Sequence, residues 1–150
     1  MRISIAGDHA GFELKEHIKQ FLSAEGHEVQ DLGAYDTAPS DYPDFAEALA
    51  KVILEGGADK GILLCGSGVG ASVAANKIPG IRAALAHDTY SAERAAKSNN
   101  AQIITMGARV IGPEVAKTIV DVWLASKFDP EGSSAGNVEA IDKLDSAKLA

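Results

Sequence analysis

The chain of 150 residues is poor in cysteine, in aromatic residues and in clustered positive charge. One cysteine cannot form an internal disulfide, which argues against a secreted disulfide scaffold. Lys and Arg number 14 against 21 Asp and Glu, with no basic cluster, so nucleic acid and an anionic membrane are poor partners. No stretch approaches the ~18 apolar residues of a membrane span, and the opening residues lack a secretory signal. We therefore expect a cytoplasmic enzyme or binding protein.

The composition and the pattern of apolar residues predict one globular domain covering residues 1–150. Hydrophobic residues make up 46% of the chain and aromatics only 5%, so the core must consist mostly of Ala, Val, Ile and Leu. Short apolar runs predict strands over 2–6, 27–33, 61–65, 82–86 and 102–107. Amphipathic segments follow each of them, and a last helix is expected to run to about Lys148. This alternation predicts an α/β fold, in which a five-stranded parallel sheet lies between layers of helices.

The ligand site of such a sheet lies at the carboxyl ends of its strands, where the strand-to-helix loops gather. Those loops carry most of the reactive side chains of this chain: Asp8, His9, Tyr42, Cys65, Ser67, His87 and Arg109. We therefore expect them to converge on one rim of the sheet.

The loop CGSGVGAS (65–72) admits two functions. Its Gly66-x-Gly68-x-x-Ala71 spacing formally matches the dinucleotide fingerprint, with Asp88 ~20 residues further on. The loop follows the third predicted strand, however, whereas that fingerprint belongs on the first strand-to-helix turn. Alternatively, amides at the start of the following helix favour a thiolate at Cys65 and stabilise negative charge on a substrate oxygen. A buried core cysteine is an equally plain explanation, and position alone does not decide.

Several segments together carry a resemblance that indicates the class: GDHAGFELK (7–15), SDYPDFA (40–46), CGSGVGASVAANKIPGIRAA (65–84), DTYSAE (88–93) and GARVIG (107–112). They closely resemble the ribose-5-phosphate isomerase B / galactose-6-phosphate isomerase family, in register from residue 1 to about 128. The resemblance implies a Rossmann-like three-layer αβα sandwich and aldose–ketose isomerisation of a sugar phosphate through an enediolate, without metal or cofactor. It also implies a homodimer, or a dimer of dimers, with active sites shared between subunits. The C-terminal tail and helix, residues 128–150, are then expected at the dimer interface.

The resemblance also implies roles for single residues. Cys65 matches the base that moves a proton between C1 and C2, and we count Ser67 with it as catalytic. Another branch of the family uses a Glu at the position of Ala71, which cannot act as a base here. Substrate contacts are implied for Asp8, His9, Tyr42, Gly66, Gly68, Val69, Gly70, Asn99 and Arg109. Arg109 matches a phosphate-binding arginine, and the loop amides match those that hold the enediolate.

Three positions depart from the family pattern. Ser98 stands where the family commonly has the histidine that opens a furanose ring. Ser133 and Asn137 stand where its tail often has two arginines that bind the phosphate, a loss of two bidentate-capable cations. A four-carbon 4-phosphate sugar cannot close a furanose ring, because its O4 is esterified, and it needs no ring-opening histidine. We therefore predict an isomerase of D-erythrulose 4-phosphate and D-erythrose 4-phosphate.

Two other functions stay open at this point. The enzyme could act on ribose 5-phosphate, with His87 or His9 opening the ring, although a structural hydrogen-bonding role suits His87 better. The chain could also be a non-catalytic sugar-phosphate-binding subunit. The presence of Cys65 and of the whole glycine loop argues against that last function, because binding alone does not need a thiol.

Overall fold

A computed structural model describes residues 1–146, and its centre is a sheet of five parallel strands. The strands are β1 (Arg2–Gly7), β2 (Glu28–Asp31), β3 (Lys60–Cys65), β4 (Ala83–Leu85) and β5 (Ile103–Gly107). Their spatial order is β2-β1-β3-β5-β4. The five predicted strands and the α/β class are thus confirmed. β2 is shorter than its predicted range, because the chain turns at Gly33, where φ is +94°.

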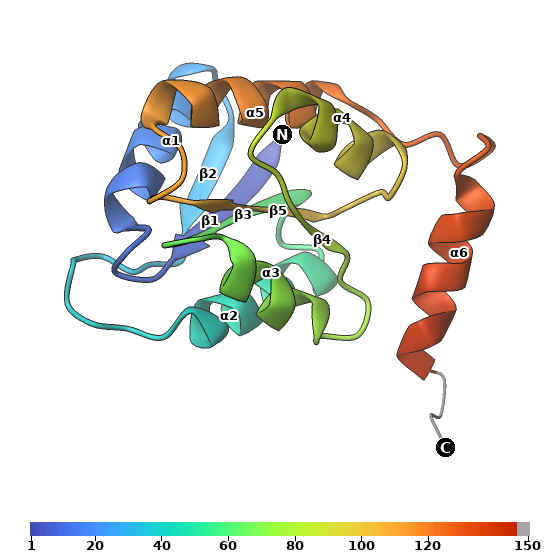
Figure 1. Ribbon diagram of the computed structural model, residues 1–150, viewed down its shortest axis with the longest axis horizontal. Helices are drawn as coiled ribbons and strands as arrows, with labels where there is room; N and C mark the ends of the chain where they lie inside the picture. Colours follow the sequence, from blue (N-terminus) through green and yellow to red (C-terminus); the bar gives the residue numbers. More distant parts are fainter. Residues whose placement is uncertain (147–150) are drawn as a thin grey trace.

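Helices cover both faces of the sheet and give the predicted three-layer sandwich (Figure 1). The helices are α1 (Phe12–Ala24), α2 (Tyr42–Leu54), α3 (Val69–Asn76), α4 (Thr89–Lys97), α5 (Pro113–Ala125) and α6 (Ala135–Lys143). In the figure α1, α4 and α5 lie on one face of the sheet, and α2 and α3 lie on the other. Because both faces are covered, the central strands are apolar along nearly their whole length, as expected for a parallel sheet.

The core forms two layers, one on each side of the sheet. The layer beneath α1, α4 and α5 contains Trp123, which is fully buried. The layer beneath α2 and α3 contains Cys65 together with aliphatic residues such as Leu49 and Ile103. Cys65 therefore belongs to the core at the point where the core meets the carboxyl end of β3.

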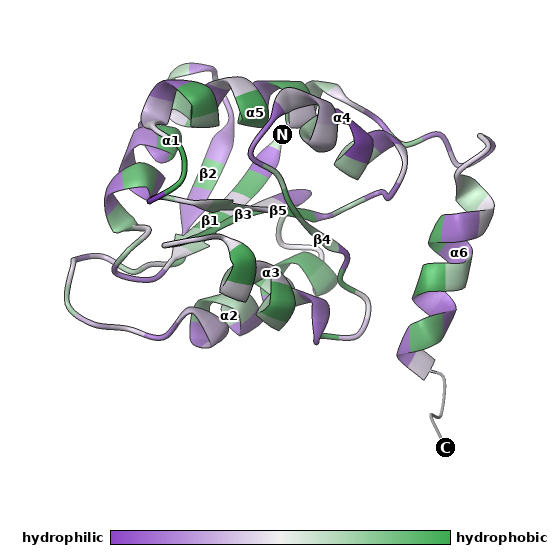
Figure 2. Ribbon diagram, in the orientation of Figure 1, coloured by the Kyte–Doolittle hydropathy of each residue, from purple (hydrophilic) through white to green (hydrophobic). Residues whose placement is uncertain are grey.

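The helix α6 stands at the side of this sandwich rather than on it (Figure 1). Arg82 pairs with Asp142 of α6 at 2.7 Å, and the N–H of Gly80 donates to Asp145 in the following 3-10 turn, Leu144–Ser146. The helix carries alternating hydrophobic and hydrophilic residues (Figure 2), of which only Val138 is buried. The helix ends at Lys143, before the predicted end near Lys148, which lies outside the described residues. Its expected place at a dimer interface stays a prediction.

A buried lysine, which the sequence analysis did not single out, ties α1 to β2. The side chain of Lys15 is fully buried, and its Nζ lies 2.9 and 2.7 Å from the two carboxylate oxygens of Asp31. Lys19 donates a further hydrogen bond to Asp31, and Glu16 accepts from both lysines. Burial alone would raise the pKa of Asp31, but hydrogen bonds from Lys15, Lys19 and the N–H of Gly33 outweigh it and lower the pKa.

Substitution of Asp31 by Asn should destabilise the fold in a pH-dependent way. At pH 7 we expect Asp31→Asn to lower the free energy of unfolding by about 3 kcal/mol, because it removes one partner of the buried Lys15 ammonium. The lowered pKa of Asp31 means that its contribution is present above the unfolded-state value, about 3.9, and is lost as the pH falls through the folded-state value. Urea unfolding measured from pH 7 to pH 3 should therefore show that the difference in free energy of unfolding between variant and wild type becomes smaller at acid pH.

The matched control is Asp59→Asn, which breaks the exposed ion pair between Arg2 and Asp59. That variant should change stability little at pH 7. A stabilising ion pair at this position would be contradicted if Asp31→Asn had the wild-type free energy of unfolding at pH 7, or if its difference from wild type did not decrease at acid pH.

Candidate active site

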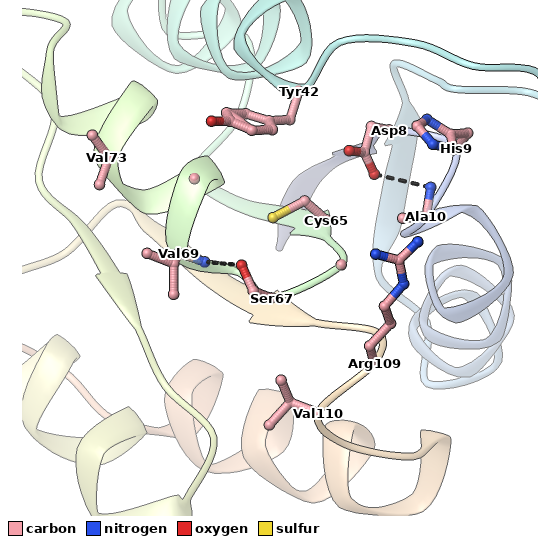
Figure 3. A pocket seen from close by; sticks show the side chains of 12 residues that line it. Asp8, His9, Ala10, Tyr42, Cys65, Ser67, Val69, Val73, Arg109 and Val110 are labelled. Carbon is pink, nitrogen blue, oxygen red and sulfur yellow. Dashed lines mark hydrogen bonds between the residues drawn. The ribbon is translucent and has the colours of Figure 1, made fainter.

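A pocket of about 660 Å³ lies at the carboxyl ends of β1, β3 and β5. The strand order reverses between β1 and β3, so the loops that follow these two strands lead to helices on opposite faces of the sheet. Such a reversal opens a crevice, which is where α/β sheets bind their ligands. Twelve residues line the pocket: Asp8, His9, Ala10, Tyr42, Cys65, Gly66, Ser67, Val69, Gly70, Val73, Arg109 and Val110 (Figure 3).

Cys65 is the last residue of β3, and its sulfur lies beside the start of α3. The residue is 3% exposed, and the backbone N–H of Gly68 donates to its Sγ at 3.1 Å. Gly68 directly precedes α3, so its N–H lies at the N-terminal end of that helix, where the backbone N–H groups point out of the helix. A donated hydrogen bond and the positive end of a helix both stabilise negative charge on the sulfur.

The loop that follows Cys65 packs its backbone directly against the end of β5. Gly68 has φ of +77°, and a Cβ there would lie 2.7 Å from the carbonyl carbon of Met106. A Cβ at Gly107 would lie 2.5 Å from the carbonyl carbon of Ser67. Only glycine fits at both positions, because the obstructing atoms are backbone. The N–H groups of Ala108 and Arg109 then donate to the carbonyls of Cys65 and Gly66, which fixes the loop to β5.

Asp8 and His9 follow β1 and form the opposite wall. Asp8 is 7% exposed, and its Oδ1 accepts the N–H groups of Ala10 and Gly11 at 3.0 and 3.1 Å. Figure 3 shows its other oxygen turned toward the side of the pocket where Tyr42 and Cys65 lie. The backbone N–H of Ser40 donates to Nδ1 of His9 at 3.1 Å, and Ser40 Oγ accepts the His9 N–H. The pocket thus contains a carboxylate and an imidazole, each fixed by hydrogen bonds from backbone N–H groups.

Tyr42 and Arg109 complete the pocket. The Tyr42 ring covers Gly70 so closely that a Cβ there would lie 2.4 Å from the ring. The Arg109 guanidinium lies over Gly66, and within residues 1–146 Arg109 is the only Lys or Arg that lines the pocket. The hydroxyl of Ser67 accepts the N–H of Val69 at 3.2 Å, which leaves its proton free to be donated. The pocket therefore offers one cation for an anionic group and a hydroxyl near the sulfur.

One predicted rim residue, His87, does not line the pocket. Its Nε2 accepts the N–H of Gly107 at 2.9 Å, so the ring supports the end of β5 from behind. His87 therefore lies at the carboxyl edge of the sheet, as expected, but outside the pocket, and its hydrogen bond agrees with the structural role favoured for it in the sequence analysis. A backbone N–H can only donate, so the Nε2 of this ring carries no proton.

Asn99 is also away from the pocket within one chain. It lines a separate cavity of about 330 Å³ beside α6, together with Arg82 and Asp145. The residues at the three departing positions lie in the same half of the molecule: Ser98 ends α4, Ser133 precedes α6 and Asn137 lies on it. A substrate contact by Asn99 stays a prediction, and it requires a second subunit.

Three lining residues escaped the sequence analysis: Ala10, Val73 and Val110. All are apolar and carry no chemical signal. Val73 lies four residues after Val69 on α3, so helical spacing from the glycine loop would have placed it on the same face. Val69, Val73 and Val110 are each more than half exposed, which makes this side of the pocket apolar.

Within residues 1–146 no three His, Cys, Asp or Glu side chains come close enough together to hold a metal ion. Over the same residues, none of the helices has the length and apolar character required to cross a bilayer.

Comparison with known proteins gives one consistent family. The family model described as Ribose/Galactose Isomerase matches residues 3–141. The chain is 50% identical over 143 residues to a protein of Pectobacterium atrosepticum named D-erythrulose-4-phosphate isomerase, covering 94% of this chain and 93% of that one. It is 45% identical over 145 residues to a protein of Listeria innocua named ribose-5-P isomerase B, covering 97% of each.

A solved structure agrees with these matches. The crystal structure of a ribose 5-phosphate isomerase from Thermotoga maritima superposes with a TM-score of 0.92 and 46% identity, covering 95% of this chain and 97% of that one. The likeness therefore extends over nearly the whole chain, and the residues matched by the family model, 3–141, include the loops that form the pocket.

Substitution of Gly68 by Ala should destabilise the fold strongly. A Cβ at this position meets the backbone of β5 and requires a left-handed conformation that costs about 1–2 kcal/mol by itself. With the added cost of overpacking we expect a loss of about 3 kcal/mol, measured by urea unfolding. Gly112→Ala is the matched control, because Gly112 also precedes a helix but has φ of −87° and open space around it. A change in Gly68→Ala no larger than in the control would show that the loop adapts.

Proposed function

This chain belongs to the ribose/galactose isomerase family and is a sugar-phosphate isomerase; we propose that it interconverts D-erythrulose 4-phosphate and D-erythrose 4-phosphate, with Cys65 as the base. The observation that carries the catalytic part is the position of the Cys65 sulfur, which lines the pocket and accepts the N–H of Gly68. A thiolate there can take a proton from substrate carbon, and the neighbouring loop offers amides for a developing oxyanion.

The proposed reaction moves one proton between two carbons. The Cys65 thiolate removes a proton from C1 of the ketose, and the electron pair of the broken C–H bond forms the C1–C2 double bond as O2 gains negative charge. Amides of the loop from Gly66 to Gly70 stabilise that charge. The hydroxyl proton on O1 is transferred to O2 through Ser67, whose own proton is free. The Cys65 thiol then returns its proton to C2, which gives the aldose and regenerates the thiolate.

The other pocket residues bind the substrate in this proposal. Asp8 accepts hydrogen bonds from substrate hydroxyls through the oxygen that Ala10 and Gly11 do not occupy, and His9 lies next to it. Tyr42 packs against Gly70 of the glycine loop and forms part of the pocket wall beside it. Arg109 binds the phosphate, since it is the only Lys or Arg that lines the pocket. One cation near the catalytic loop suits a short substrate, whose phosphate lies close to the reacting carbons.

The tetrose substrate is supported by the same three departures that predict it from the sequence. Ser98 cannot act as a base near neutral pH, and O4 of the tetrose is esterified, so no ring has to be opened. Ser133 and Asn137 offer no positive charge to a more distant phosphate. The names of relatives support both this substrate and a pentose, since they include D-erythrulose-4-phosphate isomerase and ribose-5-P isomerase B.

Ribose 5-phosphate is the competing substrate. It needs a group that opens the furanose ring, and His9 is the better candidate, because its ring lines the pocket whereas His87 already accepts the N–H of Gly107. A non-catalytic sugar-phosphate-binding subunit is disfavoured by Cys65 and by the intact amide loop.

We further propose a homodimer, or a dimer of dimers, in which the partner subunit completes each site. Asn99 would then be contributed to the pocket by the partner, and α6 would pack at the interface. A cytoplasmic location also stays a prediction.

Substitution of Cys65 by Ala should abolish isomerisation and leave the fold intact. We expect kcat to fall by at least about 100-fold, the lower range for loss of a general base. The cysteine is one of the smaller core side chains, so the melting temperature should change little. Far-UV circular dichroism with a steady-state isomerase assay measures both. Activity within a few-fold of wild type would refute the role of Cys65 as base.

A direct comparison of two substrates tests the chain length. We expect kcat/KM for D-erythrulose 4-phosphate to exceed that for D-ribulose 5-phosphate at least tenfold, about 1.4 kcal/mol of transition-state preference. Cys65→Ala is the blank for contaminating isomerases. A preference for D-ribulose 5-phosphate would contradict the tetrose proposal and would make His9→Gln the next variant.

A further inference from the structure

A buried hydroxyl group lies directly behind the proposed catalytic loop and has no part in the function described so far. Thr105 is in the middle of β5 and is 0% exposed. It points into the aliphatic layer beneath α2 and α3, on the same side of the strand as Ile103. A hydroxyl in such a layer is costly unless it finds a partner. Its Oγ1 donates to the carbonyl oxygen of Gly68 at 2.9 Å, 37 residues away in sequence.

Gly68 is the residue whose other backbone group faces the sulfur. Its N–H donates to Cys65 Sγ at 3.1 Å, and its carbonyl also accepts the N–H of Ser72, the first hydrogen bond of α3. The two groups belong to the peptide units on either side of one left-handed residue. Fixing the carbonyl of Gly68 therefore fixes the orientation of that residue, and with it the direction in which its N–H points.

We propose that Thr105 is a positioning residue, which holds the Gly68 amide against the Cys65 sulfur through its hydrogen bond to the Gly68 carbonyl. This inference rests on the proposed function, in which Cys65 is the base. Thr105 does not line the pocket, and its hydroxyl donates to the Gly68 carbonyl and not to the sulfur, so its effect passes through the loop. The Gly68 carbonyl keeps the Ser72 N–H when the hydroxyl is removed, so the start of α3 survives.

The inference differs from a purely structural role in what it predicts for valine. Valine has nearly the shape of threonine and suits an apolar layer better. A structural role for the side chain as a whole would therefore let Thr105→Val behave like wild type. A positioning role makes the hydroxyl itself necessary, so that Thr105→Ser should retain function and Thr105→Val should not.

The test measures the alkylation of Cys65 by iodoacetamide as a function of pH, and in parallel the isomerase kinetics. Cys65 is the only cysteine, so intact-protein mass spectrometry reports a single site. In Thr105→Val we expect the midpoint of the alkylation profile to rise by at least ~0.5 pH unit, because the thiolate is less well stabilised. We expect kcat to fall about tenfold with KM changed less than twofold, since a preorganised donor at the reacting atoms is loosened.

The matched variants separate the hydroxyl from other effects. Thr105→Ser should restore the wild-type midpoint and kcat. Ser4→Ala removes a different fully buried strand hydroxyl, which donates to Gln30 and does not line the pocket, and it should leave both unchanged. The charged and titratable groups that share the pocket with the sulfur, Asp8, His9, Tyr42 and Arg109, are the same in all variants. Should Thr105→Val fail to fold, Thr105→Ala carries the same expectation.

Two results would overturn the inference: a wild-type midpoint and kcat in Thr105→Val, or a Thr105→Ser variant as impaired as Thr105→Val. Failure of the proposed function looks different. In that case Cys65→Ala retains activity, while the alkylation profile of Thr105→Val still reports whether the hydroxyl orients the Gly68 amide.

Discussion

The contact between two stretches of backbone, the glycine loop after β3 and the end of β5, is the constraint on which the site depends. No side chain fits between them at Gly68 or Gly107, and hydrogen bonds from Ala108 and Arg109 close the gap. The loop is therefore held in one conformation by its packing. In the proposed function this matters because preorganised amides stabilise an oxyanion without reorganisation during the reaction.

The opposite wall is fixed by a different kind of interaction, the buried ion pair between Lys15 and Asp31. Asp31 accepts the N–H of Gly33, and the carbonyl of Gly33 accepts the N–H of Gly7, which directly precedes Asp8. A buried charge is costly unless it is paired, so the ion pair constrains the position of α1 relative to β2 and the turn at Gly33. The pocket thus lies between a wall held by backbone packing and a wall held by a buried ion pair.

The pocket is modest in charge and partly apolar, and that limits what it can select. Among the described residues Arg109 is the only Lys or Arg in its lining, and exposed valines form one side. In the proposed function an anionic substrate would therefore be held by one cation, and the remaining recognition would fall to contacts of its hydroxyl groups with Asp8 and with backbone amides. A second subunit would add groups from the region of Asn99, which in one chain lies beside α6. In the proposed homodimer, substrate choice would therefore also depend on groups that one chain does not bring to the pocket.

The sequence by itself determined the order and type of the elements, because apolar runs and glycine-rich turns encode a parallel sheet through local spacing. It also marked Cys65, Asp8, His9, Tyr42 and Arg109, since all stand at or near carboxyl ends of strands or the start of a helix. It did not reveal Thr105 or Lys15, and it did not show which partner His87 has, because each of the three acts through a partner far away in the chain: Gly68, Asp31 and Gly107. Such pairs exist only once the strands have taken their places, so only the tertiary structure decided which residues hold the site and which residues form it.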